Sequence, residues 1–228
     1  MVSLSKDATI SDYSKFIQLV YGMQNDRFYT IWDMLDNVQR FSMRCVKGVR
    51  KEDKNKTRIN ALICLSWYMS LMNRLHINVD DSIWHRFPYL CSYCGECPCA
   101  CKAEKVKTRR KVTGNSSSMP KRIKDIQEMF MEIYPTKART KGDAAIHLAE
   151  ETGELSEAVH IYMGDRSDMH FQKVSTEAAD YFSCLMGVLN SISIDTGNEI
   201  AKLFSNNCHE CHHMPCICTY EHVCNYRS

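Results

Sequence analysis

The chain has 228 residues, of which 44% are hydrophobic and 25% are charged, and its formal net charge is +2. This ordinary balance excludes a disordered polypeptide and leaves room for one large or two small domains. A charge so close to zero gives no general electrostatic match to nucleic acid, so a nucleic-acid partner is not expected.

The first seven residues carry charges where a secretory signal would need an apolar run. The most apolar stretches, residues 59–75 and 181–194, are too short or too interrupted to span a bilayer. We therefore expect a cytoplasmic protein without membrane contact. In a reducing compartment, clustered thiols bind metal in preference to pairing as disulfides.

Eight of the 13 cysteines form two clusters with one spacing, C-x-x-C followed after four residues by C-x-C. The clusters are Cys91, Cys94, Cys99 and Cys101, and then Cys208, Cys211, Cys216 and Cys218. Four thiolates so spaced can surround a tetrahedral Zn²⁺, so two structural zinc ions are expected. The tight C-x-C half leaves iron–sulfur ligation, redox-sensitive disulfides and one ion shared between clusters open, and His209, His212 and His213 are available as substitute ligands.

The second cluster follows the first by 117 positions, and the same offset matches residues before them, such as Ala61 with Ala178, Asn73 with Asn190 and Phe87 with Phe204. Further upstream the offset is 113, where Tyr21 matches Tyr134. A tandem duplication explains both, with a first repeat of residues 1–101 and a second repeat of residues 121–228. Between them, residues 102–120 are basic and contain Gly and Ser, which is typical of a solvated linker; nucleic-acid contact by this linker is the less simple reading.

The second repeat reads as helices with no lasting strand-like alternation. The pattern predicts a helix over residues 123–134, a basic loop, a long helix over 143–162, a break at 164–168, a helix over about 174–194, and a further helix before the cysteines. The first helix ends before Pro135, because proline disfavours helical geometry in the residue before it. Through the duplication, an all-α fold with the same order is expected for both repeats.

Two carboxylate motifs lie on consecutive predicted helices, Glu150-Glu151-x-x-Glu154 and Glu177-x-x-Asp180. Residues three apart share a helix face, so each motif presents paired carboxylates, which suit a hard divalent cation such as Mg²⁺. Glu151 falls within the apolar stripe of its helix and Glu154 at its edge, whereas Glu157 points outward and Glu150 is ambiguous. Gly187 and Ser191 continue the acidic strip of the second helix and leave space for a ligand.

These motifs resemble those of the MazG-like all-α nucleoside triphosphate pyrophosphohydrolases, whose signature is E-E-x-x-E followed by E-x-x-D. The similarity covers residue 123 to about 204, is especially close over the segment AIHLAEETGELSEA, and reaches the first repeat only through the duplication. It implies cleavage of a nucleoside triphosphate, ribo- or deoxyribo-, to the monophosphate and pyrophosphate with Mg²⁺ or Mn²⁺. It also implies that Glu151, Glu154, Glu177 and Asp180 hold the metal and that Glu150 orders or deprotonates the attacking water. The candidate phosphate contacts are Lys137, Arg139, Lys141 and Lys202.

The first repeat lacks these carboxylates. If the offset of 117 holds throughout, their counterparts are Asp33, Met34, Asn37, Asn60 and Ile63. We therefore expect one active and one degenerate unit packed as an intrachain pseudo-dimer around a helix-bundle core. Because related enzymes build sites between subunits, a homo-oligomer is a candidate too. By the same analogy the first repeat could contribute to the base pocket, although core packing is the simpler role for most of the candidates Trp32, Trp67, Tyr68 and Arg44.

A second function class stays open on sequence grounds. The resemblance does not require the cysteine clusters, and they survive in the repeat that lost its carboxylates. A nonenzymatic zinc-containing binding module that contacts protein or nucleic acid, with the carboxylates holding only a structural cation, is therefore the alternative to an enzyme.

Overall fold

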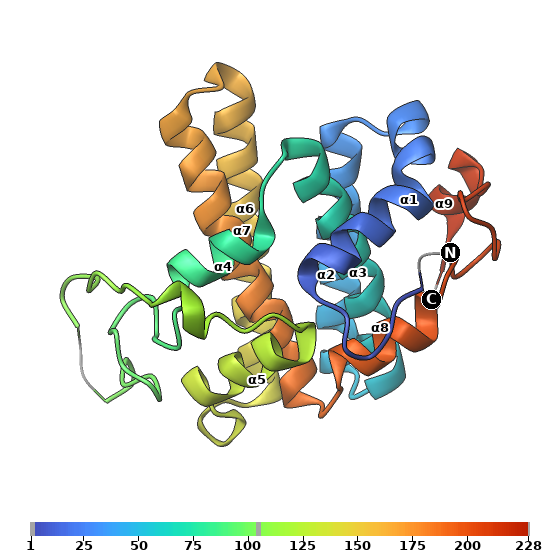
Figure 1. The fold of residues 1–228 in the computed structure, drawn as a ribbon. Coiled ribbons are helices and arrows are strands. Elements are labelled where there is room, and N and C mark those ends of the chain that lie inside the picture. Colours follow the sequence, from blue (N-terminus) through green and yellow to red (C-terminus); the bar gives the residue numbers. More distant parts are fainter. Residues whose placement is uncertain (1–2, 104–105, 228) are drawn as a thin grey trace.

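The structure, a computed structural model, describes residues 3–103 and 106–227, so residues 104 and 105 of the linker lie outside the description. Within those ranges the chain forms nine α-helices and two 3₁₀ turns and no β-strand, which confirms the expected all-α class. The first repeat contains α1 (Ile10–Phe28), α2 (Ile31–Arg50), α3 (Lys54–Leu75) and α4 (Val79–Arg86). The linker holds one 3₁₀ turn (Ser116–Ser118). The second repeat contains α5 (Ile123–Ile133), a 3₁₀ turn (Thr136–Ala138), α6 (Lys141–Asp165), α7 (Asp168–Ser191), α8 (Thr196–Phe204) and α9 (Tyr220–Asn225) (Figure 1).

The helix boundaries of the second repeat differ from the prediction at one place. α5 ends beside Pro135 as predicted, with Tyr134 as its C-cap. The chain breaks within the predicted segment 164–168, but the break is shorter than predicted because α6 runs to Asp165 and α7 begins at Asp168, so the predicted start near 174 is wrong. The turn needs only Arg166, in the left-handed conformation, and Ser167, whose hydroxyl accepts a hydrogen bond from the His170 amide and caps α7.

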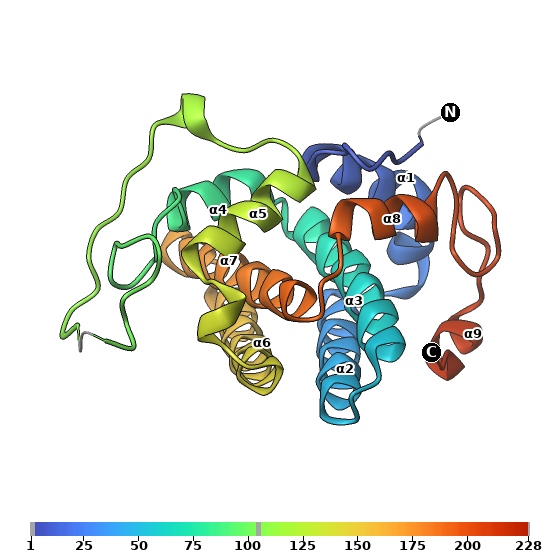
Figure 2. The same ribbon diagram turned by 90° about the horizontal axis from the view of Figure 1, so that it is seen from below.

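The helix that precedes the cysteine segment in each repeat, α4 or α8, packs on the other repeat. In Figures 1 and 2, α4 lies beside α7, and α8 lies beside α1 and α3. At the end of α4, Phe87 meets Tyr134 edge-on with ring centroids 6.2 Å apart, and at the end of α8, Phe204 meets Tyr21 edge-on at 6.5 Å. These two pairs fall at positions that the sequence offsets match, 117 for the phenylalanines and 113 for the tyrosines.

The cysteine segments directly follow α4 and α8, which we call the exchanged helices because each packs on the other repeat. The Cys99 amide donates to the Ile133 carbonyl at 2.8 Å, and the Cys216 amide donates to the Val20 carbonyl at 2.7 Å. Each cysteine segment is thus fastened to the first helix of the other repeat, again at matching positions.

One hydrophobic core runs through both repeats. Near its centre, Tyr68 of α3 and Tyr181 of α7 stack with ring centroids 5.2 Å apart. The Tyr181 hydroxyl hydrogen-bonds the Ser42 hydroxyl at 2.9 Å and the Cys64 thiol at 2.7 Å, which satisfies a fully buried polar group. This packing fixes α6 and α7, the two helices that carry the carboxylate motifs, against α2 and α3.

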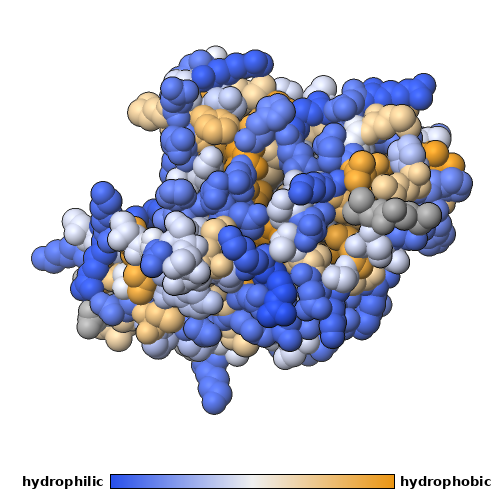
Figure 3. All heavy atoms as spheres, in the orientation of Figure 1, coloured by the Kyte–Doolittle hydropathy of each residue, from blue (hydrophilic) through white to orange (hydrophobic). Residues whose placement is uncertain are grey.

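The face seen in Figure 3 is mostly hydrophilic, with hydrophobic residues in smaller patches. No helix in the part of the chain that the structure describes is long and apolar enough to cross a membrane.

Candidate metal and substrate site

Three carboxylates meet between α6 and α7. One oxygen each from Glu151, Glu177 and Asp180 lies within 4.8 Å of the other two. Glu177 and Asp180 are three residues apart on α7 and both are buried, with Glu177 only 2% exposed. The structure therefore brings together three of the four metal ligands predicted from the sequence.

The charges of this group are partly paired, because Lys173 binds Oε1 of Glu177 and Arg86 binds Asp180. Burial raises the pKa of Glu151 to about 8, the charges of Asp180, Glu154 and Glu177 add to the effect, and Arg86 opposes it. Oε2 of Glu151 and Oε2 of Glu177 are both buried without a hydrogen-bond partner among the described residues. Because buried carboxylate oxygens are normally paired, these two oxygens and their hard donor chemistry fit a divalent metal ion.

The other two glutamates of the first motif lie at the margin. Glu154 is exposed and outside the close group, although burial and the nearby charge of Glu177 raise its pKa. Glu150 is 59% exposed and pairs with His147, its oxygen 3.3 Å from Nδ1. Both belong to α6, as Glu151 does, but the close group contains neither of them.

A residue of the first repeat completes the site. Arg86, at the end of α4, donates from Nε to both oxygens of Asp180, at 2.8 Å and 3.1 Å, and from Nη2 to Oδ2 of the same carboxylate. Burial disfavours the charged guanidinium, but the bonds and charge of Asp180, with Glu177 and Glu151 nearby, more than offset this and raise the pKa of Arg86. The side chains are 14% and 11% exposed, so this is a nearly buried ion pair.

Sequence reasoning missed Arg86. A signal was present, because the offset of 117 places Arg86 opposite Leu203 and Asp180 opposite Ile63. Arg86 of the first repeat and Asp180 of the second are both charged. Their counterparts, Leu203 of the second repeat and Ile63 of the first, are both apolar. Such a joint change indicates contact, provided that α4 is expected to cross to the second repeat.

A small pocket of about 20 Å³ opens next to the carboxylates. Its lining includes Arg139, His147, Cys184, Gly187 and Ser191. Cys184 lies one turn after Asp180, and burial with the nearby charge of Glu151 raises its pKa to about 12, so the thiol is neutral. Gly187 and Ser191, predicted on a strip of α7 with space for a ligand, line this pocket, but its volume is about that of a single water molecule and none of the three carboxylates lines it.

The four basic residues predicted as phosphate contacts are dispersed. Arg139 lines this pocket with its guanidinium 4.5 Å from the centroid of the Tyr134 ring, whereas Lys137 and Lys141 are exposed on the approach to α6. Lys202 lies on α8 and pairs with Glu199 at 2.8 Å, which in turn pairs with Arg58 at 2.6 Å. The roles of all four stay predictions.

The residues of α2 that correspond to the carboxylates of α6 differ from those expected with the offset of 117. α2 and α6 begin with the same capping box, Thr30 with Asp33 and Thr140 with Asp143, which sets their offset at 110. With this offset the buried faces of the two helices match, as with Val38 and Leu148. The expected counterparts Asp33, Met34 and Asn37 are therefore wrong, because the α6–α7 hairpin has seven residues more than the α2–α3 hairpin between the matched positions of the two repeats.

The corrected counterparts of Glu150, Glu151 and Glu154 are Arg40, Phe41 and Arg44. Asn60 and Ile63 remain the counterparts of Glu177 and Asp180. Phe41 and Ile63 line one pocket together, as Glu151 and Asp180 lie together in the second repeat.

The aromatic candidates for a base pocket lie elsewhere. Trp32 stands 4.6 Å from the His160 ring on the outer part of α2 and α6. Tyr68 is in the core, and Trp67 packs edge-on against Tyr29 at 5.1 Å. Arg44 donates to the Tyr226 carbonyl at 3.0 Å. Core packing, the simpler role, is what the structure shows for Tyr68.

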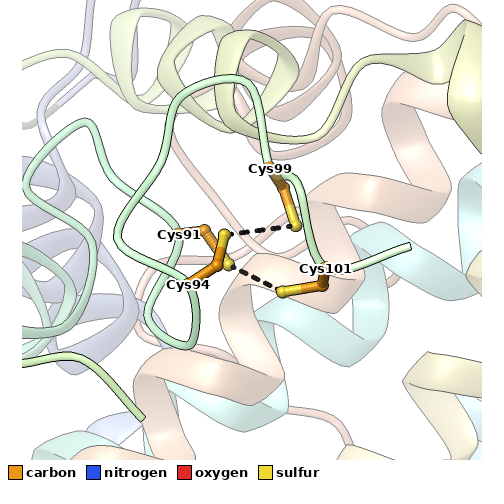
Figure 4. A group of neighbouring side chains, drawn as sticks. All are labelled: Cys91, Cys94, Cys99 and Cys101. Carbon is orange, nitrogen blue, oxygen red and sulfur yellow. Dashed lines mark hydrogen bonds between the residues drawn. The ribbon is translucent and has the colours of Figure 1, made fainter. Parts of the chain in front are cut away.

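The two cysteine clusters form separate groups, each with four sulfur atoms within 4.8 Å of one another. The Sγ distances are 3.7 Å for Cys91–Cys101 and 4.0 Å for Cys94–Cys99 in the first group (Figure 4). They are 3.9 Å for Cys208–Cys218 and 3.8 Å for Cys211–Cys216 in the second. Four sulfurs at about 2.3 Å from a tetrahedral zinc lie about 3.8 Å apart, so each group could hold one Zn²⁺.

The local backbone supports this arrangement. The Tyr93 and Ala100 amides donate to Cys91 and Cys94 at 3.5 Å and 3.4 Å, and the Glu210 and Ile217 amides do the same for Cys208 and Cys211. Such bonds stabilise thiolates. Every described cysteine is free of disulfide bonding, and the histidines of the second segment lie outside the four-sulfur group.

No protein-family model, no curated protein and no solved structure matches this chain, so what it does has to be inferred from its own residues and their geometry.

Proposed function

We propose that the chain is a MazG-like pyrophosphohydrolase that cleaves a nucleoside triphosphate, ribo- or deoxyribo-, to the monophosphate and pyrophosphate. In this proposal the two repeats form an intrachain pseudo-dimer with one working site. The paired contacts at matching positions, Phe87 with Tyr134 and Phe204 with Tyr21, support the pseudo-dimer. The carboxylates of Glu151, Glu177 and Asp180 support the site.

The observation that carries the proposal is the pair of buried, unpartnered oxygens on Glu151 and Glu177. Leaving a buried polar oxygen without a partner costs on the order of 1–3 kcal/mol, and more when the group is charged. A solvated acidic surface needs no such arrangement. A site built to receive Mg²⁺ or Mn²⁺ does, and Glu154 stands next to Glu177 to complete the set.

When bound, the cation would offset the negative charge that develops on the phosphate oxygens during hydrolysis. The residues of the chain supply the rest. Glu150, exposed beside Glu151, can accept the proton that water loses as it attacks phosphorus. The bond from phosphorus to the bridging oxygen breaks, and pyrophosphate leaves. His147, paired with Glu150, can orient that carboxylate.

Arg86 is the contribution of the first repeat to this site. Its Nε and Nη2 bind Asp180, which leaves Nη1 free to donate to a phosphate oxygen. The guanidinium is nearly buried and held in one orientation, so it is preorganised for a charge-assisted bond. Arg139, at the wall of the adjoining pocket, is placed to meet another part of the nucleotide.

The cysteine groups have a structural role in this proposal. Each is fastened to the first helix of the other repeat through the Cys99 or Cys216 amide. One zinc ion in each would lock the exchanged segments and hold α4, and so Arg86, against α7.

The experiment is a product analysis. Zinc-loaded protein is incubated with a panel of ribo- and deoxynucleoside triphosphates and Mg²⁺ or Mn²⁺, and pyrophosphate and monophosphate are identified. We expect pyrophosphate from at least one nucleotide, and a loss of at least about a hundredfold in kcat for Glu151→Gln and Asp180→Asn.

Glu157→Gln is the matched control, because Glu157 is exposed on the outer face of the same helix. It should keep full activity. Absence of pyrophosphate from every nucleotide, or equal turnover by Glu151→Gln and Glu157→Gln, would refute the enzyme and favour the binding module instead.

A further inference from the structure

A second charged feature lies on the first repeat, outside the carboxylate site. It is a groove of about 500 Å³ between α2, the start of α3 and the C-terminal segment. Its lining contains one carboxylate, Asp53, and six cationic side chains, from Arg40, Arg44, Lys47, Lys51, Lys56 and Arg227. We call it the basic groove.

The positive charge in the basic groove is not neutralised by the described residues. None of the six cationic side chains has a carboxylate oxygen within 4.0 Å in the described part of the chain. Burial lowers the pKa of Arg44, and the like charges of Arg40 and Arg227 lower it further. Cations gathered in this way repel one another, and a bound anion would remove the repulsion.

The two arginines are held in place without being neutralised. Arg40 donates to the carbonyls of Val223, Cys224 and Tyr226 at 3.2 Å, 2.9 Å and 2.8 Å. Arg44 donates to the Tyr226 carbonyl at 3.0 Å. Backbone carbonyls carry no net charge, so these bonds fix the guanidinium groups and keep their positive field. Both also lie over the Phe41 ring, at 5.1 Å and 5.2 Å from its centroid.

Lys47, Lys51 and Lys56 continue the row of cations that begins with Arg40 and Arg44. Positions 40, 44, 47 and 51 follow one face of α2 through its C-terminal half and its cap, a length of about 16 Å at 1.5 Å per residue. Lys56 faces them from the first turn of α3. A single small anion would meet only part of this row, whereas a chain of linked phosphates carries several negative charges and can meet several of these cations at once.

The corrected register gives this groove a counterpart in the second repeat. Arg40 and Arg44 stand where α6 has Glu150 and Glu154. The same place on the scaffold is therefore acidic in one repeat and basic in the other. An acidic site collects a cation, and a basic one collects an anion.

We propose that the basic groove binds a polyphosphate group, either as an inorganic polyphosphate or as the phosphate chain of a nucleotide. This inference does not rest on the catalytic proposal, because it uses only the charges and contacts of the first repeat. Arg40 and Arg44 form the fixed end of the site, and Lys47, Lys51 and Lys56 form its flexible side.

The test measures binding by isothermal titration to zinc-loaded full-length protein at low salt, without added Mg²⁺ or Mn²⁺, so that the carboxylate site repels the same ligands. The probes are pyrophosphate, tripolyphosphate, a nucleoside triphosphate panel, an uncharged nucleoside and a single-stranded oligonucleotide. We expect tripolyphosphate and the nucleotides to bind and the nucleoside not to bind. A nucleotide tighter than tripolyphosphate would identify the natural source as a nucleotide, and equal affinity would identify the inorganic ligand.

Two variants test the site. Arg40→Gln with Arg44→Gln should weaken tripolyphosphate binding by at least about tenfold, since each charge-assisted bond is worth about 1.5–3 kcal/mol. Lys47→Gln with Lys51→Gln, which touches no carbonyl of the C-terminal segment, should weaken it by several-fold even if the arginine variant loosens that segment. Lys107→Gln with Lys111→Gln, in the exposed linker, changes the net charge equally and should leave affinity unchanged.

The proposal is overturned if no polyphosphate binds, or if all three variants bind alike. It is also overturned if the oligonucleotide binds while tripolyphosphate and the nucleotides do not, because the groove would then be a nucleic-acid surface.

Discussion

Arg86 and Asp180 join the two repeats through a nearly buried ion pair, with Nε of the arginine 2.8 Å and 3.1 Å from the two carboxylate oxygens. The first repeat has Phe41, Asn60 and Ile63 where the second has Glu151, Glu177 and Asp180, yet its Arg86 lies beside the carboxylates of the second. The first repeat therefore contributes to the charge of the candidate site on the second.

Removing the arginine alone should destabilise the fold. Arg86→Leu leaves Asp180 buried without its partner, and we expect the free energy of unfolding to fall by about 3 kcal/mol. Adding Asp180→Ile to Arg86→Leu gives the same two apolar residues that stand at the matching positions, Leu203 and Ile63. This double variant should recover most of the lost free energy of unfolding. Denaturant unfolding of the metal-free single and double variants measures both.

Arg74→Leu is the matched control for that experiment. Its partner Asp26 is 67% exposed, so its loss should cost less than about 1 kcal/mol. If the double variant is as unstable as the sum of the two single ones, the ion pair is not what couples these residues.

The raised pKa of Glu151 predicts how stability depends on pH when no divalent cation occupies the carboxylate site. The carboxyl holds its proton up to about pH 8 in the folded protein and only to about pH 4.5 when unfolded. The stability that this protonation supports is therefore present at low pH and lost as the pH rises from about 4.5 through 8. Thermal melts of wild type and Glu151→Gln over this range should converge at low pH, with the variant the more stable at high pH.

Glu157→Gln should keep the pH profile of the wild type, since that side chain is exposed. Added Mg²⁺ should reverse the loss at high pH in the wild type and in Glu157→Gln, because both keep the three carboxylates. An identical pH profile for Glu151→Gln and wild type would contradict the burial of this carboxyl.

Metal analysis should find two zinc ions per chain, one for each cysteine group. Cys99→Ser should retain one zinc ion and lower the melting temperature by about 5 °C or more, because the exchanged segment loses its clamp. Cys97 is exposed and outside the four-sulfur group, so Cys97→Ser should keep both ions. A zinc content that Cys99→Ser does not change would rule out the first group as a zinc site.

The basic residues near the carboxylates should contribute unequally to substrate binding. Arg139 lines the pocket beside the carboxylates, so Arg139→Gln should raise KM by about tenfold, the cost of one charge-assisted bond. Lys202 pairs with Glu199 on α8, and Lys202→Gln should change KM much less. Steady-state kinetics with the best nucleotide of the panel separate the two, and a reversed order would place the phosphates on the α8 side.

Local patterns in the sequence predicted much of this structure. Glu177 and Asp180 are three residues apart on a helix, so their placement on one face followed from helix periodicity. The cysteine spacing similarly predicted two groups of four, because each group closes within one short segment. Both are features that a few neighbouring residues determine.

Features that depend on distant parts of the chain were not predictable in this way. Helical periodicity places Arg86 at the end of a helix, but nothing local says that this helix crosses to the other repeat. The offset between α2 and α6 differs from that between α3 and α7 because the α6–α7 hairpin is the longer one, and the paired capping boxes of Thr30 and Thr140 reveal this. The early start of α7 came from Ser167, a helix cap inside a segment that looked like a break.

The exchange of α4 and α8 has a consequence for how the molecule assembles. Phe16 touches Phe204, almost two hundred positions away, so a large loop must close before either half of the core is complete. Neither repeat is then a self-sufficient folding unit, and a chain cut within the linker should persist as two interlocked fragments rather than two independent proteins. Because each half completes the core of the other, a half can lose its functional residues while its helices are still needed for the fold. One set of carboxylates could be lost, and a basic groove could take its place, while the helices around it remained indispensable to the partner half.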